Sequence, residues 1–163
     1  MIPMPTLLVV DVPNMFHESL NIHKQKVDYA KVFELLTEFR ITRKLAYGDN
    51  FGTFVNYLKH MRFKSYQHIH YYTKMTVDTI SCLDHFTNLI MLGSEPSNAF
   101  IFEAAVAKAL TVYSVGFNLP KIFYTNSEMI QLDEVHTTKP VVLLADVFSG
   151  ILETSALGSA EGF

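Results

Sequence analysis

The chain has 163 residues, of which 49% are apolar and 18% are charged, so its composition is that of one folded domain and excludes intrinsic disorder. The formal net charge of −3 argues against a strongly basic protein that binds nucleic acid non-specifically, although a nuclease with a local basic patch stays compatible. The single Cys82 excludes an intramolecular disulfide, and neither a secretory signal nor a membrane-length apolar run is visible. We therefore expect a cytoplasmic protein with no membrane partner.

The first half of the chain alternates between strand-like and helix-like patterns. Residues 6–12, TLLVVDV, are short, branched and not alternating, which predicts a strand buried on both faces. Residues 28–39 carry an apolar stripe at helical spacing behind a capping aspartate, which predicts an amphipathic helix. Residues 43–49 predict a second strand and residues 51–61 a second helix.

The alternation continues in the second half. Residues 64–73 predict a strand, and residues 76–86 are ambiguous. The remaining predictions are strands at 89–93, 111–117 and 121–126, a helix at 97–110, and a strand or strand-turn-helix at 140–152. Such alternation is typical of right-handed crossovers. We expect an α/β fold, with a mostly parallel central sheet and helices on both faces, as one domain over residues 1–152 and a tail at 153–163.

Acidic side chains follow three of the predicted strands: Asp11 ends the first, Asp49 ends the second, and Glu95 follows the strand at 89–93. Because sites in open parallel sheets lie outside the carboxyl ends of the strands, we expect these acids at one edge. Like charges brought together cost free energy unless a cation neutralises them. An acidic cluster there would suit Mg²⁺ or Mn²⁺.

Several stretches resemble a known family when their order and spacing are taken together: VVDVPNMF, KVDYAKVFELL, LAYGDNFGTFVNYLKHMRFK, VDTISCLD, LIMLGSEPSNAF and LTVYSVGF. The first is similar to an opening Asp-x-x-Asn motif, the fourth to a Val-Asp motif with a second Asp six residues on, and the fifth to a strand-end acidic motif. Together they resemble the NYN domains, a branch of the PIN-like ribonucleases, over residues 6–133.

This resemblance implies a PIN-like fold and a divalent-metal-dependent endoribonuclease, with Mg²⁺ or Mn²⁺ as cofactor and RNA as substrate. Carried over residue by residue, Asp11 would be the central metal ligand and Asn14 would orient water or phosphate. Asp78, Asp84 and Glu95 would be further metal ligands. The implied catalytic residues are Asp11, Asn14, Asp84 and Glu95.

The sequence departs from the family pattern at the strand-end motif. Ser97 stands where a second acid belongs, Glu95 replaces the shorter Asp, and Gly93-Ser94 inverts the usual Ser-Gly. A missing carboxylate weakens a site for a hard cation. Two interpretations stay open. The chain is a weakened ribonuclease, or it is a catalytically degenerate NYN-like domain, a pseudoenzyme that serves an assembly through a protein partner or a second copy.

Each acid also has a structural interpretation. Asp11 would cap the turn that follows its strand, Asp49 would cap the next helix, and Glu95 would benefit from the positive end of a helix. Asp78 and Asp84 would be solvated surface acids. For Asp11 we favour a site because its strand looks buried, and for Asp49 we favour the cap. A geometric criterion separates the two functional interpretations: an active site predicts at least three carboxylates within about 6 Å of one another.

Two small groups of cations, in residues 40–44 and in KHMRFK at 59–64, also have both a functional and a structural interpretation. Either group would be able to bind phosphate. The structural interpretation places cations at the carboxyl end of a helix, where they are favourable, and we prefer it.

Overall fold

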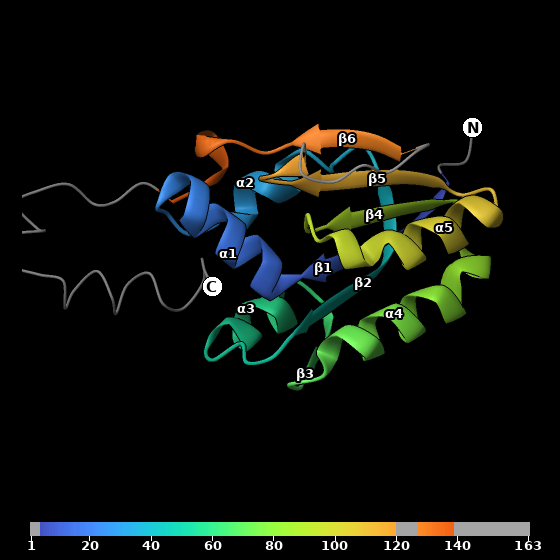
Figure 1. Cartoon of the computed structure of the whole chain (residues 1–163), viewed down its shortest axis with the longest axis horizontal. Coiled ribbons are helices and arrows are strands. Elements are labelled where there is room, and N and C mark those ends of the chain that lie inside the picture. The colour runs from blue at the N-terminus through green and yellow to red at the C-terminus, as the bar shows by residue number, and fades with distance from the viewer. Residues whose placement is uncertain (1–3, 120–126, 139–163) are drawn as a thin grey trace, which may run out of the picture.

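Six strands form one sheet, and all pairings between them are parallel (Figure 1). The computed structural model describes residues 4–119 and 127–138. The strand order is β3-β2-β1-β4-β5-β6. The strands are β1 Pro5–Asp11, β2 Arg40–Gly48, β3 Lys64–Gln67, β4 Asn88–Leu92, β5 Thr111–Gly116 and β6 Ser127–Gln131. The predicted α/β fold with a parallel sheet is therefore confirmed.

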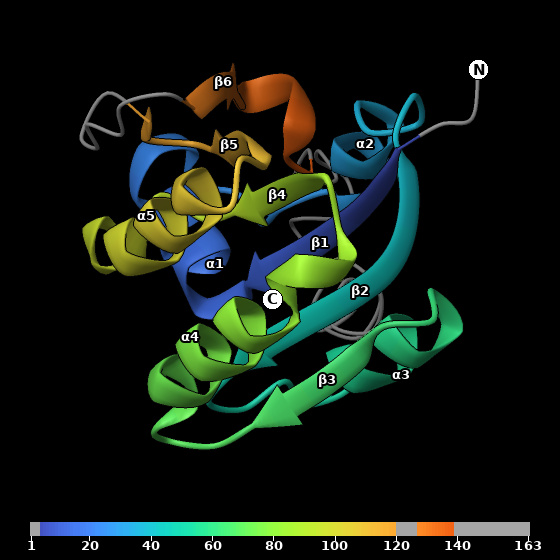
Figure 2. The same ribbon diagram turned by 90° about the vertical axis from the view of Figure 1, so that its right-hand side faces the viewer.

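Helices cover both faces of the sheet, and the side chains of β1 alternate between the two layers. Leu8 and Val10 pack into a core with the first three helices, whereas Leu7 and Val9 pack into a second core with the last two. This alternation is the two-residue period of a strand. Figure 2 shows α4 and α5 in contact on one side of the sheet. The helices are α1 Val12–His23, α2 Tyr29–Glu34, α3 Phe54–His60, α4 Tyr71–Cys82 and α5 Ala99–Ala107.

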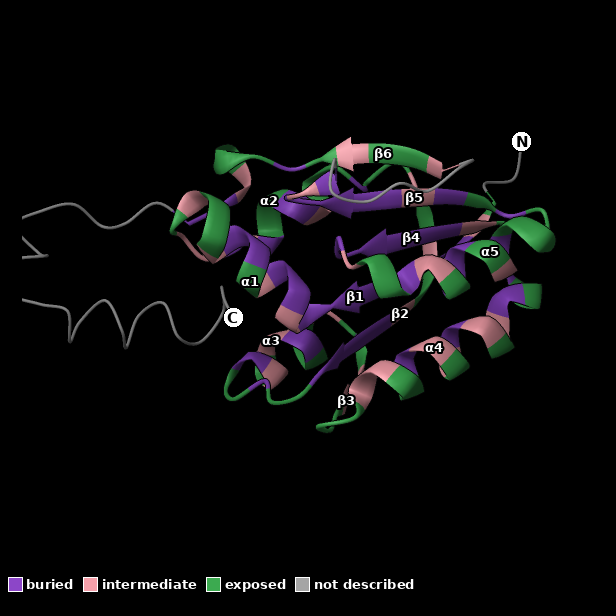
Figure 3. Cartoon of the chain, viewed as in Figure 1, coloured by how far each residue is buried: buried purple, intermediate pink, exposed green. Residues whose placement is uncertain are grey.

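Strands β1 and β4 form the buried centre of the molecule (Figure 3). The four apolar side chains at positions 7–10 are at most 1% exposed. Burying each such side chain stabilises the fold by about 1.5–3 kcal/mol. The predicted buried strand at residues 6–12 is thus confirmed as far as Asp11, where the strand ends. This rigid pair of strands carries the candidate site at its carboxyl end.

The predicted strand at residues 64–73 is wrong after Gln67, because the chain turns and begins helix α4 at Tyr71. The ambiguous segment at 76–86 resolves into the rest of α4 and a 3-10 helix, η1 (Leu83–His85). The reason is a buried stripe at positions 75, 79 and 83, which has the four-residue spacing of a helix face. The strand was predicted because tyrosine and histidine occupy positions 66, 68, 70 and 72, which is the two-residue period of a strand.

Two further predictions need correction near the amino end. Helix α1 was not predicted, although Asp11 caps it and Pro13 lies in its first turn. The predicted helix at 28–39 is shorter, since α2 ends at Glu34. The predicted elements at 121–126 and 140–152, and the domain boundary at 152, lie outside the described residues. Within the described ranges, no helix is long and apolar enough to cross a lipid bilayer.

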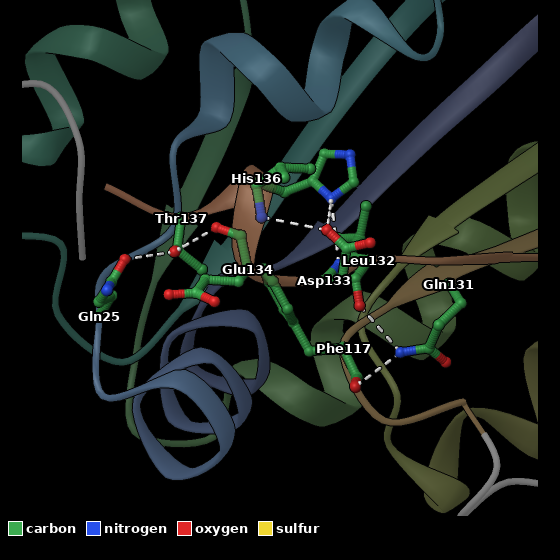
Figure 4. Close-up of polar contacts among 9 residues, drawn as sticks. Gln25, Phe117, Gln131, Leu132, Asp133, Glu134, His136 and Thr137 are labelled. Carbon is green, nitrogen blue, oxygen red and sulfur yellow. Dashed lines mark hydrogen bonds and ion pairs between the residues drawn. The ribbon is translucent and has the colours of Figure 1, made fainter. Parts of the chain in front are cut away.

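The segment after β6 returns to the connection between α1 and α2 (Figure 4). The Thr137 hydroxyl lies 2.6 Å from Gln25 Oε1, and Gln131 Nε2 donates to the Phe117 carbonyl at 2.8 Å. A 3-10 helix, η4 (Glu134–His136), is capped by Asp133, whose Oδ1 accepts from the Val135 N–H at 3.0 Å. These contacts attach the β6 edge of the sheet to the helical layer that contains α1.

Candidate functional site

The strand order reverses between β1 and β4, and we call the region outside the carboxyl ends of these two strands the crevice. From β1 the chain leads to α1 on one face of the sheet, and from β4 it leads to α5 on the other. In open α/β sheets, ligands bind outside the carboxyl ends of the two strands at such a switch point. Asp11 ends β1, and Gly93, Ser94 and Glu95 follow β4.

Asp11 is fully buried at the floor of this crevice. Its Oδ1 accepts hydrogen bonds from the Asn14 N–H at 3.3 Å and from the Tyr71 hydroxyl at 3.0 Å. Its Oδ2 has no hydrogen-bond partner among the described residues. One oxygen therefore serves as the N-cap of α1, while the other remains for a ligand or a proton. The structural and functional interpretations of Asp11 are compatible.

Burial dominates the electrostatics of Asp11 and raises its pKa from 3.8 to about 7. The hydrogen bonds from Asn14 and Tyr71 lower the pKa, whereas the negative charge of Glu95 raises it. Near neutral pH the folded chain therefore divides between the acid and the carboxylate. A cation bound at Oδ2 would favour the carboxylate, because opposite charge stabilises the ionised form.

Asn14 joins the ends of the two strands. Its Oδ1 accepts from the Ser94 N–H at 2.5 Å, and its Nδ2 donates to Glu95 Oε2 at 3.4 Å. The side chain thus holds the turn after β4 against the first turn of α1 and directs Glu95 toward the crevice. The structure brings together three of the residues that the sequence singles out: Asp11, Asn14 and Glu95.

The structure explains why glycine comes before serine in the Gly93-Ser94 pair, the reverse of the family order. Gly93 has φ +139°, and a Cβ there would lie 3.1 Å from Asp11 Cβ and 3.3 Å from Asn14 Oδ1. Only glycine adopts this backbone freely and leaves that space empty. Ser94 is buried, and its Oγ accepts from the Asn118 N–H at 3.3 Å. The inverted pair therefore has a packing role.

Three residues at the site were missed from the sequence: Tyr71, Tyr72 and Asn98. The Tyr72 hydroxyl donates to the buried Asn98 Oδ1 at 2.6 Å, and Asn98 Nδ2 has no partner within the described part of the chain. Tyr71 stays protonated as a donor because burial and the charge of Asp11 raise its pKa. The signal in the sequence is the four-residue spacing of positions 71, 75, 79 and 83, which puts Tyr71 on the buried stripe of a helix, but its contact with Asp11 depends on the fold.

The structure does not bring Asp78 to Asp11. Asp78 lies about 10 Å along α4 from Tyr71, at 1.5 Å per residue. Its carboxylate accepts from the Tyr47 hydroxyl at 2.8 Å and pairs with Lys74 at 3.0 Å. The structural interpretation of Asp78 is the better one, since both oxygens have protein partners.

Asp84 lies still farther from the crevice, in the 3-10 helix that precedes β4. Because α4 runs back along the sheet, it delivers Asp84 to the amino end of β4, opposite the crevice. There Asp84 is exposed and pairs with Lys108 at 2.6 Å, which lowers its pKa. The expectation that Asp84 joins Asp11 as a metal ligand is therefore not met, because a parallel sheet separates the two ends of its strands.

Asp49 follows β2, but it does not cap the next helix. Thr53 is the N-cap position of α3, while Asp49 Oδ1 accepts from the neighbouring Asn50 N–H at 2.9 Å. Its negative charge is among the influences that raise the pKa of Tyr71, so it lies on the crevice side of the molecule. The preferred cap role of Asp49 is corrected accordingly.

The donor set of the crevice fits one weakly held divalent cation. Asp11 and Glu95 supply two carboxylates, and no group of three His, Cys, Asp or Glu that could hold a metal occurs in residues 4–119 and 127–138. The three-carboxylate criterion is thus unmet in that part of the chain. Mg²⁺ commonly binds through one or two carboxylates, with waters and phosphate oxygens as its other ligands. Asp11 Oδ2 and Glu95 would be able to hold such an ion.

Comparisons with known proteins support the fold and leave the activity open. No protein-family model matches the chain, and no curated protein matches it. Among solved structures, the chain is similar to a protein of unknown function from Vibrio parahaemolyticus RIMD 2210633, with a TM-score of 0.73 and 14% sequence identity. The alignment covers 83% of this chain and 97% of that one. At this identity the likeness shows a shared α/β fold, and a fold alone does not specify a function.

Proposed function

We propose that this chain is a divalent-metal-dependent endoribonuclease of the NYN/PIN-like type, with one Mg²⁺ or Mn²⁺ held weakly in the crevice between β1 and β4. The observation that carries the proposal is the fully buried Asp11, whose Oδ2 has no partner among the described residues. A buried, unpaired carboxylate oxygen costs free energy that a functional ligand would offset. Its position at the switch point of the sheet is where such folds bind ligands.

The residues around Asp11 would have distinct tasks. Tyr71 fixes the carboxylate through Oδ1 and leaves Oδ2 toward the ligand. Asn14 holds Glu95, the second metal ligand, and Gly93 keeps the floor of the crevice free of a side chain. When bound, the ion would lower the pKa of a bound water and neutralise charge on the phosphate. The choice of RNA as substrate rests on the motif resemblance.

A second candidate function has its own supporting observation. Of the four carboxylates that the resemblance implies as metal ligands, two lie at the crevice, since Asp78 and Asp84 are engaged with Lys74 and Lys108 elsewhere. A catalytically degenerate NYN-like domain would keep Asp11 as the N-cap of α1 and bind a protein partner or a second copy. This candidate predicts a folded chain without metal affinity.

The two candidates are separated by Mn²⁺ titration calorimetry at neutral pH, with RNA cleavage assayed on the same samples. We expect saturable binding and cleavage in the wild type, and loss of both in Asp11→Asn. Asp84→Asn is the matched control, because it removes one carboxylate at the opposite end of β4 and should keep both activities. A folded wild type that binds no Mn²⁺ at millimolar concentration and cleaves no RNA would sink the nuclease proposal in favour of the degenerate domain.

A further inference from the structure

A second cavity lies between strands β2 and β3 and helix α4, and the function proposed above does not use it. Its volume is about 530 Å³. That size is within the range of small-molecule sites, about 300–1,000 Å³. Asp11, Asn14 and Glu95 are not among the residues that line it, so it is distinct from the metal crevice. We call it the β3 pocket.

The sheet side of the β3 pocket follows from strand alternation. Arg43, Leu45 and Tyr47 are two residues apart on β2 and share one face of the sheet. The parallel register pairs Leu45 with Lys64 and Tyr47 with Tyr66 on β3. The floor of the pocket therefore has a cationic end with Arg43 and Lys64 and an aromatic end with the two tyrosines.

The β3 pocket has excess positive charge on a chain whose net charge is −3. Of its three cations, Lys74 pairs with Asp78 at 3.0 Å, and Asp78 also accepts from the Tyr47 hydroxyl. Arg43 and Lys64 form no ion pair with a described residue, although the Arg43 guanidinium lies 5.6 Å from the centre of the Phe86 ring. Two positive charges thus face the pocket without a counter-charge among the described residues, which favours an anionic ligand.

The aromatic end indicates what the anion is attached to. The ring centroids of Tyr47 and Tyr66 lie 6.4 Å apart, and the Lys74 ammonium lies 5.5 Å from the Tyr66 centroid. Inorganic phosphate alone would leave most of 530 Å³ unfilled. Cations beside aromatic rings are the combination with which proteins bind single-stranded nucleic acid, because phosphates pair with the cations and bases stack on the rings.

Helix α4 links the β3 pocket to the crevice. Tyr71 contacts Asp11, while Lys74 and Asp78, about 5 and 10 Å farther along the helix axis, line the pocket. Tyr47 pairs with Asp11 in the sheet register. We propose that the β3 pocket binds one nucleotide of a single-stranded RNA, with the two phosphates that flank the nucleotide at Arg43 and Lys64 and the base at the aromatic end. The RNA strand in this assignment rests on the proposed function, but the binding itself needs no metal.

The test measures binding of a fluorescein-labelled oligouridylate in EDTA, so that metal chemistry does not contribute. We expect Arg43→Gln/Lys64→Gln to weaken binding by about tenfold or more and to reduce the slope of log K against log salt by about 1.4, the value for two phosphate contacts on a single strand. Lys59→Gln is the matched control, because it removes one exposed cation on α3, across the sheet. An affinity and salt slope unchanged in the double variant would overturn the proposal.

Lys64→Gln alone keeps the test decisive if the double variant fails to fold, since Lys64 is exposed and has no ion pair with a described residue. Its expected reduction in slope is about 0.7. Competition identifies the ligand: uridine monophosphate should displace the oligonucleotide at lower concentration than inorganic phosphate. Equal displacement by both would overturn the nucleotide assignment.

Cys82 reports the location, because this single cysteine lines the β3 pocket and is partly exposed. Bound oligonucleotide or uridine monophosphate should slow the reaction of Cys82 with a small thiol reagent. An unchanged rate at saturating ligand would place the binding elsewhere and overturn the proposal. Metal-free binding with protection of Cys82, but without Mn²⁺-dependent cleavage, would support the pocket and contradict only the proposed nuclease function.

Discussion

Asp11 both stabilises and destabilises the fold. Its Oδ1 caps α1, which stabilises the fold, whereas burial of the whole carboxyl group penalises its ionised form. Such a group makes the free energy of unfolding depend on pH. An exposed N-cap would accept from the same N–H. Capping alone therefore does not explain why Asp11 is buried with an Oδ2 that has no partner among the described residues.

The first prediction concerns the pH dependence of stability. Because the pKa of Asp11 is about 7 in the folded chain and near 3.8 when unfolded, the native state binds more protons between these values. The free energy of unfolding should therefore fall as pH rises from about 4 to 7, by up to roughly 4 kcal/mol, and change little above. Asp11→Asn lacks this titration, so its stability relative to wild type should rise across the same window.

Urea unfolding at a series of pH values from 4 to 8.5 measures this difference. Asp84→Asn is the control, because Asp84 is exposed and its pKa is lowered by Lys108, so its contribution has the opposite sign. Parallel pH profiles for wild type and Asp11→Asn would show that Asp11 does not titrate as the structure implies.

At the scale of the element, α4 is the helix that organises both sites. One side of it packs into the core through Met75 and Thr79, and its first turn places Tyr71 on Asp11. Farther along, Lys74 and Asp78 line the β3 pocket. A shift of this helix would therefore move residues of both the crevice and the pocket.

The second prediction concerns the Tyr71 hydroxyl. Its hydrogen bond favours the ionised form of Asp11, so Tyr71→Phe should raise the pKa of Asp11 above its present value near 7. The free energy of unfolding should then continue to fall to a higher pH than in the wild type, as measured by the same urea series. Tyr47→Phe removes a comparable hydroxyl, bonded to Asp78, and should leave the profile near pH 7 in place. A shift of equal size in both variants would contradict the assignment.

At the scale of the whole molecule, the proposed metal site would link metal binding to folding. An ion that binds only the folded chain stabilises it by RT ln(1 + [L]/Kd), which is about 1.4 kcal/mol for a site with a Kd near 1 mM at 10 mM Mn²⁺. The third prediction is a rise of a few degrees in Tm on adding 10 mM Mn²⁺ at pH 7.5. The rise should be absent in Asp11→Asn and kept in Asp84→Asn. An equal rise in all three proteins would indicate binding outside the crevice.

Much of the fold and half of the candidate site could be predicted from the amino-acid sequence. Buried strands, their alternation with helices, and the position of Asp11 at the end of β1 follow from local patterns of apolar residues. The convergence of Asp11 and Glu95 follows from the general rule that parallel strands present their carboxyl ends at one edge. Asn14 is the third residue that the structure joins to them, and its place in the site was predicted from the motif resemblance.

The other features could not be predicted from the sequence, because they depend on how distant elements run relative to one another. The direction of α4 across the sheet brings Tyr71 to Asp11 and carries Asp84 to the opposite end. The pairing of β2 with β3 creates the β3 pocket from Arg43 and Lys64, which belong to two separate cation groups in the sequence. Local patterns in the sequence indicate the period of apolar residues and the capping residues of helices. They do not indicate the strand order and register, which bring distant side chains together.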